Sequence, residues 1–401
     1  MKEGWTYKKL GEVGITQTGT TPSKSNPNNY GNYIPFIRPA EISIDGSGHI
    51  NYDSEIKLSE EGLKNGRLFK KGATLMVCIG SIGKLGYAER NISCNQQINV
   101  ITPFDEYYPK YIFYAMSSPA FQKECLKIAQ GAQATLPIIN KGKWSNLLIS
   151  IPSSREEQQR IVSRLDAAFA HIDELKANAE KQLSEARVLF QKALTKAMEP
   201  KEGWEEKKLG EVCDIFGRIG FRGYTTKDLV PSAKEGAISL SPSNIQDGQM
   251  DYSKCTYISW FKYDESPEIK IYNGDILLVK TGSSYGKSAL VENLPHEATI
   301  NPQSVVLKNT KINTRFFAYQ IRTNRVLEEF DKFVSGTAIP TFSQTKLSTV
   351  PILFPSEKEQ QYIVSRLDAV SAHIRELEEV LQKTISECDA LKQALLRKVF
   401  E

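Results

Sequence analysis

Apolar residues in two long stretches of the chain recur with the spacing of a coiled coil. In residues 357–401 the apolar positions are separated by three and four residues in turn, and only Thr384 interrupts them. Neither this stretch nor residues 155–198 contains proline or glycine. The pattern predicts two long helices that pack along a narrow seam. In the second helix the seam comprises Leu367, Val370, Ile374, Leu377, Leu381, Cys388, Leu391 and Leu395.

The first helix carries the same register with smaller side chains. Its seam positions are Leu165, Ala168, Ile172, Leu175, Ala179, Gln182, Ala186, Leu189 and Ala193. Because small residues in one helix stand where the other has large ones, the two helices can interdigitate closely. The alternative is that each helix packs independently on its own globule.

Two blocks of sequence occur twice, one near the start of each predicted long helix and one at the start of each half. The motif IVSRLD at residues 161–166 returns at residues 363–368, and the opening of residues 2–13, KEGW followed by KKLGEV, returns at residues 201–212. Between the matched blocks the halves differ widely. The chain is therefore interpreted as a tandem duplication in the order globule, helix, globule, helix, in which one framework carries two different variable units.

The order of the repeats also predicts the direction of the helices. Domain termini are often close together, so the second helix is expected to start where the first one ends and to run back alongside it. A helix of about 44 residues is roughly 66 Å long at a rise of 1.5 Å per residue. We therefore expect a dumbbell with pseudo-twofold symmetry in which residues 1 and 401 meet.

The segments between the helices are predicted to be mixed α/β globules. Strand-like runs occur at residues 73–79, 98–101, 275–279 and 304–307, and short helices are expected at residues 109–117 and 314–323. The predicted fold class is thus an α/β (α+β) tandem duplication, with two mixed α/β domains separated by an antiparallel coiled coil. The expected boundaries are residues 1–151, 152–199, 200–354 and 355–401.

Composition narrows the functional classes. The chain of 401 residues has a net charge of +4, which permits a nucleic-acid partner without requiring one. None of its six cysteines forms a CxxC pair, so reduced thiols are expected rather than a disulfide framework or a zinc site. No apolar run approaches the length that spans a membrane, and no signal peptide is recognisable. These features predict a cytoplasmic protein.

Four loops rich in glycine, hydroxyl and basic residues have the chemistry of contacts to DNA phosphates and bases. They are residues 19–24, 80–84, 217–224 and 282–288. A Gly-Ser segment that ends in Gly-Lys follows a strand in both halves, which places Lys84 and Lys287 at equivalent positions. The alternative is that these loops are only turns.

Catalytic motifs are absent or incomplete in the sequence. Residues 282–288 fall one residue short of a Walker A loop, because Thr281 stands where its first glycine would be. His171 and His373 occupy equivalent helix positions, where packing or a partner surface is expected rather than catalysis. We therefore predict a non-catalytic chain with no metal site.

The repeated motifs resemble the specificity subunits of type I restriction-modification enzymes. Gly-Trp-x-x-Lys-Lys-Leu-Gly-Glu-Val opens each half and Pro-Ser-x-x-Glu-Gln-Gln-x-Ile-Val-x-Arg-Leu-Asp, or a close variant, opens each helix. The resemblance covers the whole chain. It implies that each globule reads one half of a bipartite site in double-stranded DNA and that the helices dock two methyltransferase subunits, which restriction subunits join. It also implies no cofactor in this chain, whereas the partner subunits of the family use S-adenosylmethionine, ATP and magnesium.

The resemblance also directs attention to two sets of residues. Expected DNA contacts are Thr20, Thr21, Ser23, Lys24, Arg38, Ser81, Lys84, Gln97, Arg218, Arg222, Tyr224, Ser283, Ser284, Tyr285, Lys287 and Gln303. Expected partner contacts are Glu157, Gln158, Gln159, Arg164, Asp166, Glu359, Gln360, Gln361, Arg366 and Asp368. Two other functions remain open: a recognition subunit of a related fused restriction-methylation system, and a coiled-coil interaction scaffold that does not bind DNA.

Overall fold

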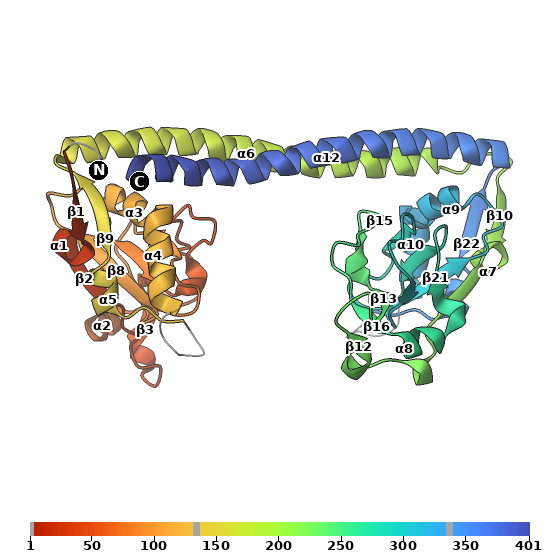
Figure 1. Ribbon diagram of the computed structural model, residues 1–401, viewed down its shortest axis with the longest axis horizontal. Coiled ribbons are helices and arrows are strands. Elements are labelled where there is room, and N and C mark those ends of the chain that lie inside the picture. The colour runs from red at the N-terminus through yellow and green to blue at the C-terminus, as the bar shows by residue number, and fades with distance from the viewer. Residues whose placement is uncertain (1–3, 131–136, 334–339) are drawn as a thin grey trace. The chain divides into compact units, whose positions relative to one another are not determined.

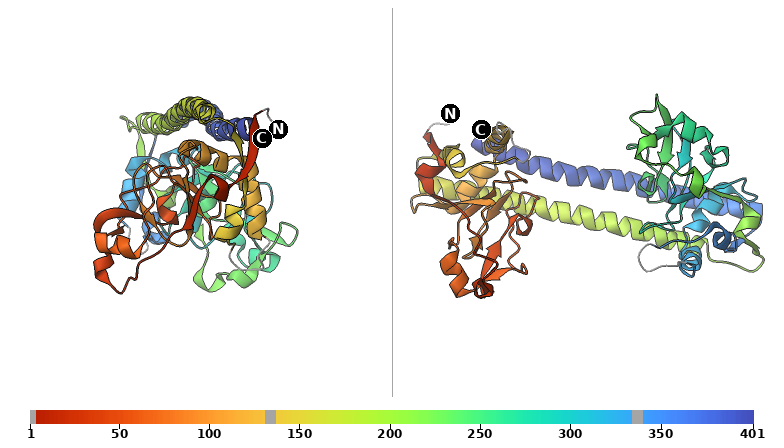
Figure 2. Two further views of the ribbon diagram at one scale, coloured as in Figure 1. Left: turned by 90° about the vertical axis from the view of Figure 1, so that its left-hand side faces the viewer. Right: turned by 90° about the horizontal axis from the view of Figure 1, so that it is seen from below.

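The computed structural model describes residues 4–130, 137–333 and 340–401 (Figures 1 and 2). The chain divides into two compact units. Unit 1 comprises Met1–Lys181 with Leu381–Glu401, and unit 2 comprises Gln182–Val380. Each unit therefore combines one globule with parts of both long helices. Their elements follow in the same order, which confirms the tandem duplication.

A four-stranded antiparallel sheet forms the centre of unit 1. Its order is β2 (Gly14–Thr18), β8 (Ile98–Pro103), β5 (Thr74–Val77) and β6 (Leu85–Tyr87). A second sheet joins β4 (Lys57–Leu58), β3 (Tyr30–Ile37) and β7 (Ser93–Cys94), and β1 (Trp5–Lys9) pairs with β9 (Leu148–Pro152). All four residues of β5 are buried because both faces of this strand are covered.

Unit 2 repeats this architecture with a larger second sheet. Its central sheet has the order β11 (Asp214–Gly217), β21 (Ser304–Lys308), β18 (Ile276–Val279) and β19 (Ser288–Leu290). The second sheet has the order β12 (Leu229–Val230), β16 (Tyr257–Ser259), β13 (Gly236–Leu240), β20 (Ala298–Ile300) and β17 (Lys270–Ile271). Two further pairs are β10 (Glu205–Lys208) with β22 (Pro351–Phe354), and β14 (Ile245–Gln246) with β15 (Gln249–Met250).

Short helices cover the sheets. In unit 1 they are α1 (Leu10–Val13), α2 (Glu60–Asn65), α3 (Pro109–Ser117), α4 (Pro119–Gln130) and α5 (Lys141–Ser145). In unit 2 they are α7 (Leu209–Val212), α8 (Trp260–Asp264), α9 (Thr314–Ile321), α10 (Asn324–Asp331) and α11 (Gln344–Leu347). In both units 3-10 turns complete the loops: η1 (Pro27–Asn29), η2 (Pro39–Glu41), η3 (Gly220–Arg222), η4 (Thr226–Asp228), η5 (Pro242–Asn244) and η6 (Pro267–Ile269). The predicted strands and the two predicted short helices are confirmed within two residues at most of their ends, with the strand expected at residues 73–79 shortened to β5.

The two long helices are α6 (Arg155–Ala197) and α12 (Glu357–Phe400). In unit 1, Ile161 and Leu165 near the start of α6 share a core with Leu396 and Phe400 at the end of α12. In unit 2 the relationship is reversed, and the end of α6 shares a core with the start of α12. The helices lie side by side in each unit (Figures 1 and 2). They are therefore antiparallel as predicted, and the alternative of two independent helices is wrong.

Only half of the predicted seam is buried. Ile172, Ala179, Ala186, Leu381 and Cys388 are buried, as the heptad spacing requires. The other row of predicted seam positions contains four exposed leucines. Leu175 is 53% exposed, Leu189 58%, Leu377 41% and Leu391 49%. Ion pairs occupy the flank that this row was expected to fill: Lys176 with Asp389 at 2.7 Å, Lys392 with Asp173, and Arg187 with Glu378 at 3.0 Å. The helices therefore pack through one apolar row with a charged flank.

The two ends of the chain approach the same residue of unit 1. Tyr111 packs against Trp5, with ring centroids 6.4 Å apart, and against Phe400 at 5.4 Å. The Ser150 hydroxyl also donates to the Phe400 carbonyl at 3.2 Å. The predicted meeting of residue 1 with residue 401 lies outside the described residues, since residues 1–3 are not among them.

Membrane-spanning helices and disulfide bonds are both absent from these described ranges. No helix in them is long and apolar enough to cross a membrane. The six cysteines, all within them, are free thiols, as expected from their spacing.

Candidate nucleic-acid interface

In unit 1, backbone and side-chain hydrogen bonds bring four polar segments together at one end of the central sheet. The Cys78 N–H donates to the Gln97 carbonyl at 2.8 Å, and the Thr20 N–H donates to the Cys94 carbonyl at 2.9 Å. The Lys84 ammonium reaches the Pro39 carbonyl at 2.7 Å. These contacts join residues 19–24, 38–41, 80–84 and 95–97 into one group of loops.

Unit 2 builds the same group from different side chains. The Lys280 N–H donates to the Gln303 carbonyl at 2.8 Å, and the Asn301 N–H donates to the Leu240 carbonyl at 2.8 Å. Left-handed glycines, Gly282 at φ 98° and Gly286 at φ 82°, turn the chain between β18 and β19. The result is a hollow of about 200 Å³ lined by Ser241, Pro242, Ser243, Thr281, Gly282, Ser283, Ser284 and Gln303.

An Asn-x-Gln bracket orients one glutamine in each group. The Asn95 amide donates to Gln97 Oε1 at 2.8 Å, and the Asn301 amide donates to Gln303 Oε1 at 3.1 Å. With its oxygen engaged, each glutamine keeps its NH₂ group for an outside acceptor. The Asn-x-Gln motif occurs in both halves of the sequence, at residues 95–97 and 301–303. This repeat could have identified Asn95 and Asn301, which were not among the predicted residues.

Lys84 and Lys287, which are equivalent in the two halves, differ in whether the side chain is free to contact DNA. Lys84 is half-buried and held by the Pro39 carbonyl. Lys287 is exposed, and its side chain makes no hydrogen bond or ion pair with any residue in the described part of the chain. Lys280 was not among the predicted contacts. Its ammonium is half-buried, and burial lowers its pKa. Ser23, Lys24, Ser81, Ser283 and Gln303 are exposed as well.

Arg218 does not meet the expectation of a DNA contact. Its side chain is only 7% exposed, and its guanidinium donates to the Ile300 carbonyl at 3.1 Å and the Thr299 hydroxyl at 3.2 Å. Burial lowers the pKa of this guanidinium. Interior acceptors use the guanidinium to hold the end of β11 against β20, so Arg218 could contact DNA only by leaving them.

Four other predicted contacts have partners within the chain. Arg38 forms an ion pair with Glu41 at 2.5 Å, and Arg222 forms one with Glu268 at 3.3 Å. The Tyr224 hydroxyl is 2.8 Å from the Ser239 hydroxyl, and the Tyr285 hydroxyl donates to Asp331 at 2.5 Å. These groups can reach DNA only by exchanging such contacts. Thr20, Thr21, Gln97 and Ser284 are partly exposed in the loop groups.

Two glutamines of the repeated helix-start motif are buried rather than exposed to a partner. Gln158 is 2% exposed and Gln360 is 4% exposed. The Gln158 side-chain oxygen accepts from the Tyr108 N–H at 2.7 Å, and that of Gln360 accepts from the Asn313 N–H at 2.9 Å. Tyr108 and Asn313 are the N-caps of α3 and α9. Neither glutamine can contact a partner in this conformation, because both satisfy backbone donors at these helix ends.

The two aspartates of the motif also hold their globules. Asp166 accepts from the Tyr114 hydroxyl at 2.5 Å and pairs with Lys110 at 2.9 Å. Asp368 accepts from the Tyr319 hydroxyl at 2.6 Å and pairs with Arg315 at 3.3 Å. Burial, together with the nearby carboxylate, raises the pKa of Tyr114 and of Tyr319. We call the set Gln158, Asp166, Gln360 and Asp368 the helix clamp.

The remaining motif residues face outward. Gln159, Arg164, Gln361 and Arg366 are exposed. Glu157 and Glu359 are partly exposed and pair with Arg160 at 2.6 Å and Lys201 at 3.1 Å. These six, unlike the helix clamp, remain accessible to another protein. No group of three or more His, Cys, Asp or Glu residues in the described ranges is arranged to hold a metal ion.

Comparison with known proteins gives a consistent picture. The model of the type I restriction modification DNA specificity domain matches residues 2–185 and again residues 201–387. The MjaIX specificity subunit of Methanocaldococcus jannaschii is 23% identical, covering 98% of this chain and 92% of that protein. The EcoKI specificity subunit of Escherichia coli is 21% identical, covering 100% of this chain and 89% of that protein.

Solved structures share the fold. A chain from a study of complex assembly and conformational transition of the type I restriction-modification system superimposes with a TM-score of 0.76 at 19% identity, covering 100% of this chain and 98% of that chain. The HsdS subunit from Thermoanaerobacter tengcongensis has a TM-score of 0.53, also at 19% identity, covering 100% of this chain and 97% of the other. With two copies of the family domain across almost its whole length, the chain belongs to the type I restriction-modification DNA specificity family and is a non-catalytic DNA-recognition subunit.

Proposed function

We propose that each globule reads a different half of a bipartite DNA site through the loop group at one end of its central sheet. The observation that carries the proposal is that one hydrogen-bonded framework, including the Asn-x-Gln bracket, presents different exposed side chains in the two units. We propose the domain boundaries 1–151, 152–199, 200–354 and 355–401 for the two readers and the two helical regions.

In this proposal the loop residues divide into two roles. Lys24, Lys280 and Lys287 contact phosphates, which fix position without reading sequence. Gln97 and Gln303 offer their NH₂ groups to acceptors on base edges in the major groove, such as the N7 atom of a purine, the O6 atom of guanine or the O4 atom of thymine. Hydroxyl groups at Ser23, Ser81, Ser283 and Ser284 supply shorter contacts to bases or phosphates.

The experiment for this role is replacement of Gln303 by alanine in the full restriction-modification system. We expect the methylation pattern of the host to lose discrimination at one base pair of one half-site, by about 1 kcal/mol for the loss of one hydrogen bond. Gln191→Ala is the matched control, because Gln191 is an exposed glutamine on α6 that is outside the loop group and about 200° round the helix from Leu189. An unchanged pattern in the Gln303 variant would argue against base reading by this bracket.

The long helices are proposed to dock two methyltransferase subunits, which restriction subunits then join. The accessible motif residues, with the exposed leucines Leu175, Leu189, Leu377 and Leu391, form the proposed contact surface. Exposed apolar side chains grouped among polar ones are typical of protein interfaces.

We further propose that this chain acts in the cytoplasm without a cofactor, and that S-adenosylmethionine, ATP and magnesium serve only its partner subunits.

A further inference from the structure

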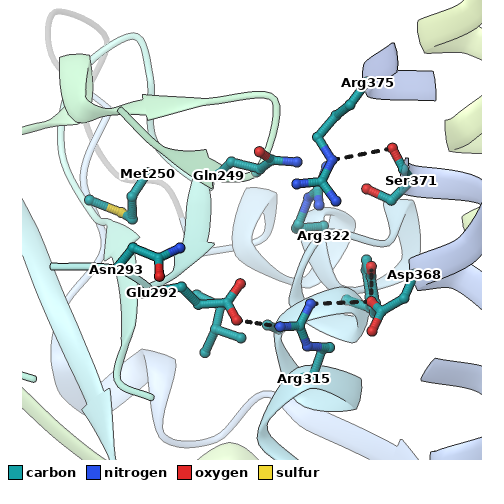
Figure 3. Close-up of a pocket in the computed structure, with 13 residues that line it drawn as sticks. Gln249, Met250, Glu292, Asn293, Arg315, Arg322, Asp368, Ser371 and Arg375 are labelled. Atoms are coloured by element: carbon teal, nitrogen blue, oxygen red, sulfur yellow. Dashed lines mark hydrogen bonds and ion pairs between the residues drawn. The ribbon is translucent and has the colours of Figure 1, made fainter. Parts of the chain in front are cut away.

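A cationic hollow lies beside the helix clamp of unit 2, between the β14–β15 turn, α9 and α12 (Figure 3). Its volume is about 140 Å³. Three arginines line it, Arg315, Arg322 and Arg375, against two carboxylates, Glu292 and Asp368. The amide side chains of Gln249 and Asn293 also line it.

One arginine engages both carboxylates. Arg315 pairs with Asp368 at 3.3 Å and with Glu292 (Figure 3). In the part of the chain that the structure describes, Arg322 and Arg375 have no carboxylate within ion-pair distance. The Arg322 guanidinium donates only to the Asp247 carbonyl at 2.7 Å, and the Arg375 guanidinium only to the Ser371 carbonyl at 3.4 Å. Two positive charges of the hollow therefore lack a counter-ion.

The backbone and a ring fix the position of the Arg322 guanidinium. Gly248, at φ 81°, lies so close that a Cβ there would be 1.9 Å from the guanidinium carbon. The Phe190 ring lies 5.3 Å from that carbon. Burial lowers the pKa of Arg322, which shows that its charge is kept at an energetic cost. A fixed arginine beside an exposed one, Arg375, is a geometry suited to an anion with several oxygens.

The equivalent hollow in unit 1 has the opposite charge. Four aspartates and two lysines line it: Asp45, Asp166, Asp173, Asp389, Lys110 and Lys392. Asp173 stands at the position equivalent to Arg375, and Lys392 neutralises it. A protein that docked alike on both helix starts would meet opposite charges in the two hollows. A shared protein partner is therefore a poor match for the unpaired arginines.

DNA is also a poor match for this hollow. Leu290, at the far end of β19, lines the hollow and pairs with Ile276 at the start of β18. The DNA loops of unit 2 leave the opposite ends of these two strands. The volume is also below the roughly 300–1,000 Å³ of pockets for drug-sized ligands. A small anion fits both the position of the hollow and its volume.

We propose that this hollow binds a small tetrahedral oxyanion, either free phosphate or the phosphate group of a small metabolite, between Arg322 and Arg375. Arginine forks bind such oxygens in pairs. Gln249 and Asn293 can donate to the remaining oxygens. This proposal does not depend on DNA reading.

The test is titration of the full-length chain with inorganic phosphate by calorimetry, in a background of potassium chloride at constant ionic strength. We expect one binding site, with the dissociation constant at least 10-fold higher in Arg375→Gln. Lys383→Gln is the matched control, because Lys383 is an exposed cation of α12 outside the hollow. We expect it to bind phosphate as the unmodified chain does.

Thermal unfolding in the same solutions gives a second readout, since phosphate should raise the midpoint of the unmodified chain and not that of Arg375→Gln. Competition by adenosine monophosphate would extend the site to phosphate esters, and its failure would restrict the site to free phosphate; both results support an oxyanion site. Equal phosphate affinity in Arg375→Gln and the unmodified chain, or no binding above the chloride background, would overturn the proposal.

Discussion

The hydroxyl of Tyr319 donates a hydrogen bond of 2.6 Å to the carboxylate of Asp368. Tyr114 makes the same contact with Asp166 in unit 1 at 2.5 Å. Tyr319 belongs to α9 and Asp368 to α12, so the bond joins the globule to the long helix. The repetition of this contact explains why the motif that opens each helix recurs in the sequence: the same junction is built twice.

Replacement of Asp368 by alanine is expected to destabilise unit 2. The variant leaves the Tyr319 hydroxyl without its acceptor and the Arg315 guanidinium with Glu292 alone, which should cost about 1–2 kcal/mol of unfolding free energy. Chemical denaturation followed by circular dichroism measures this loss. The matched control is Glu376→Ala on an exposed face of the same helix, which should change stability by less than about 0.5 kcal/mol. Equal effects of the two variants would contradict a clamp at Asp368.

Tyr114 and Tyr319 donate to the two aspartates of the helix clamp, and we call them the clamp tyrosines. Their environment predicts a loss of stability in alkaline solution. The folded-state pKa of each is raised by burial and by its aspartate. Below the unfolded value near pH 10 both states are protonated, so the contribution is fully present. Above that value the unfolded chain ionises first, and the contribution is lost as pH rises toward the folded pKa.

Denaturation midpoints between about pH 8 and 11 measure this dependence. The double variant Tyr114→Phe, Tyr319→Phe should be less stable at neutral pH and should lose less stability on going from pH 9 to pH 11 than the unmodified chain. If both proteins declined equally over this interval, the clamp tyrosines would not be the groups responsible.

Lys287 and Lys84 should respond differently to replacement by glutamine. Lys287 is exposed and has no partner in the described part of the chain, so we expect Lys287→Gln to weaken DNA binding by about 1 kcal/mol for all sequences. Its salt slope should also fall by about 0.9. Lys84→Gln removes a bond to the Pro39 carbonyl and should lower folding stability. Fluorescence anisotropy at several salt concentrations separates the two effects, and an unchanged slope for Lys287→Gln would exclude a phosphate contact.

Assembly should depend on the outward-facing part of the repeated motif. Charge reversal at Arg164 together with Arg366 is expected to weaken binding of the methyltransferase, because both arginines are exposed on equivalent surfaces. Gln158→Ala should instead reduce the stability of unit 1, since Gln158 is buried. Native mass spectrometry of the mixed subunits measures the first effect. Undiminished two-to-one assembly with both arginines reversed would place the interface elsewhere.

Sequence periodicity predicted the elements better than it predicted their exposed faces. The heptad spacing correctly placed α6 and α12, because such a period follows from helix geometry. Their antiparallel packing was correctly predicted from the order of the repeats. It failed to show that Leu175 and Leu391 would be exposed, since that depends on ion pairs such as Lys176 with Asp389 across the helices. Spacing within one helix carries no information on which flank its neighbour occupies.

The candidate sites show a similar division. Loops rich in glycine and hydroxyl groups could be recognised from composition, and the structure groups them at one end of each central sheet. The burial of Arg218 and of Gln158 could not be predicted, because their acceptor or donor groups are backbone atoms distant in sequence. Residue type alone does not distinguish an exposed contact from a buried polar anchor.

The most direct test of two independent readers is a domain exchange read out by methylome sequencing. Residues 200–354 would be replaced by the corresponding globule of another family member, with both long helices and residues 1–151 unchanged. If the two globules read DNA independently, one half-site of the methylated sequence should change while the other is retained. A change in both half-sites, from a chain that still assembles and methylates, would contradict the independent reading of DNA by the two globules.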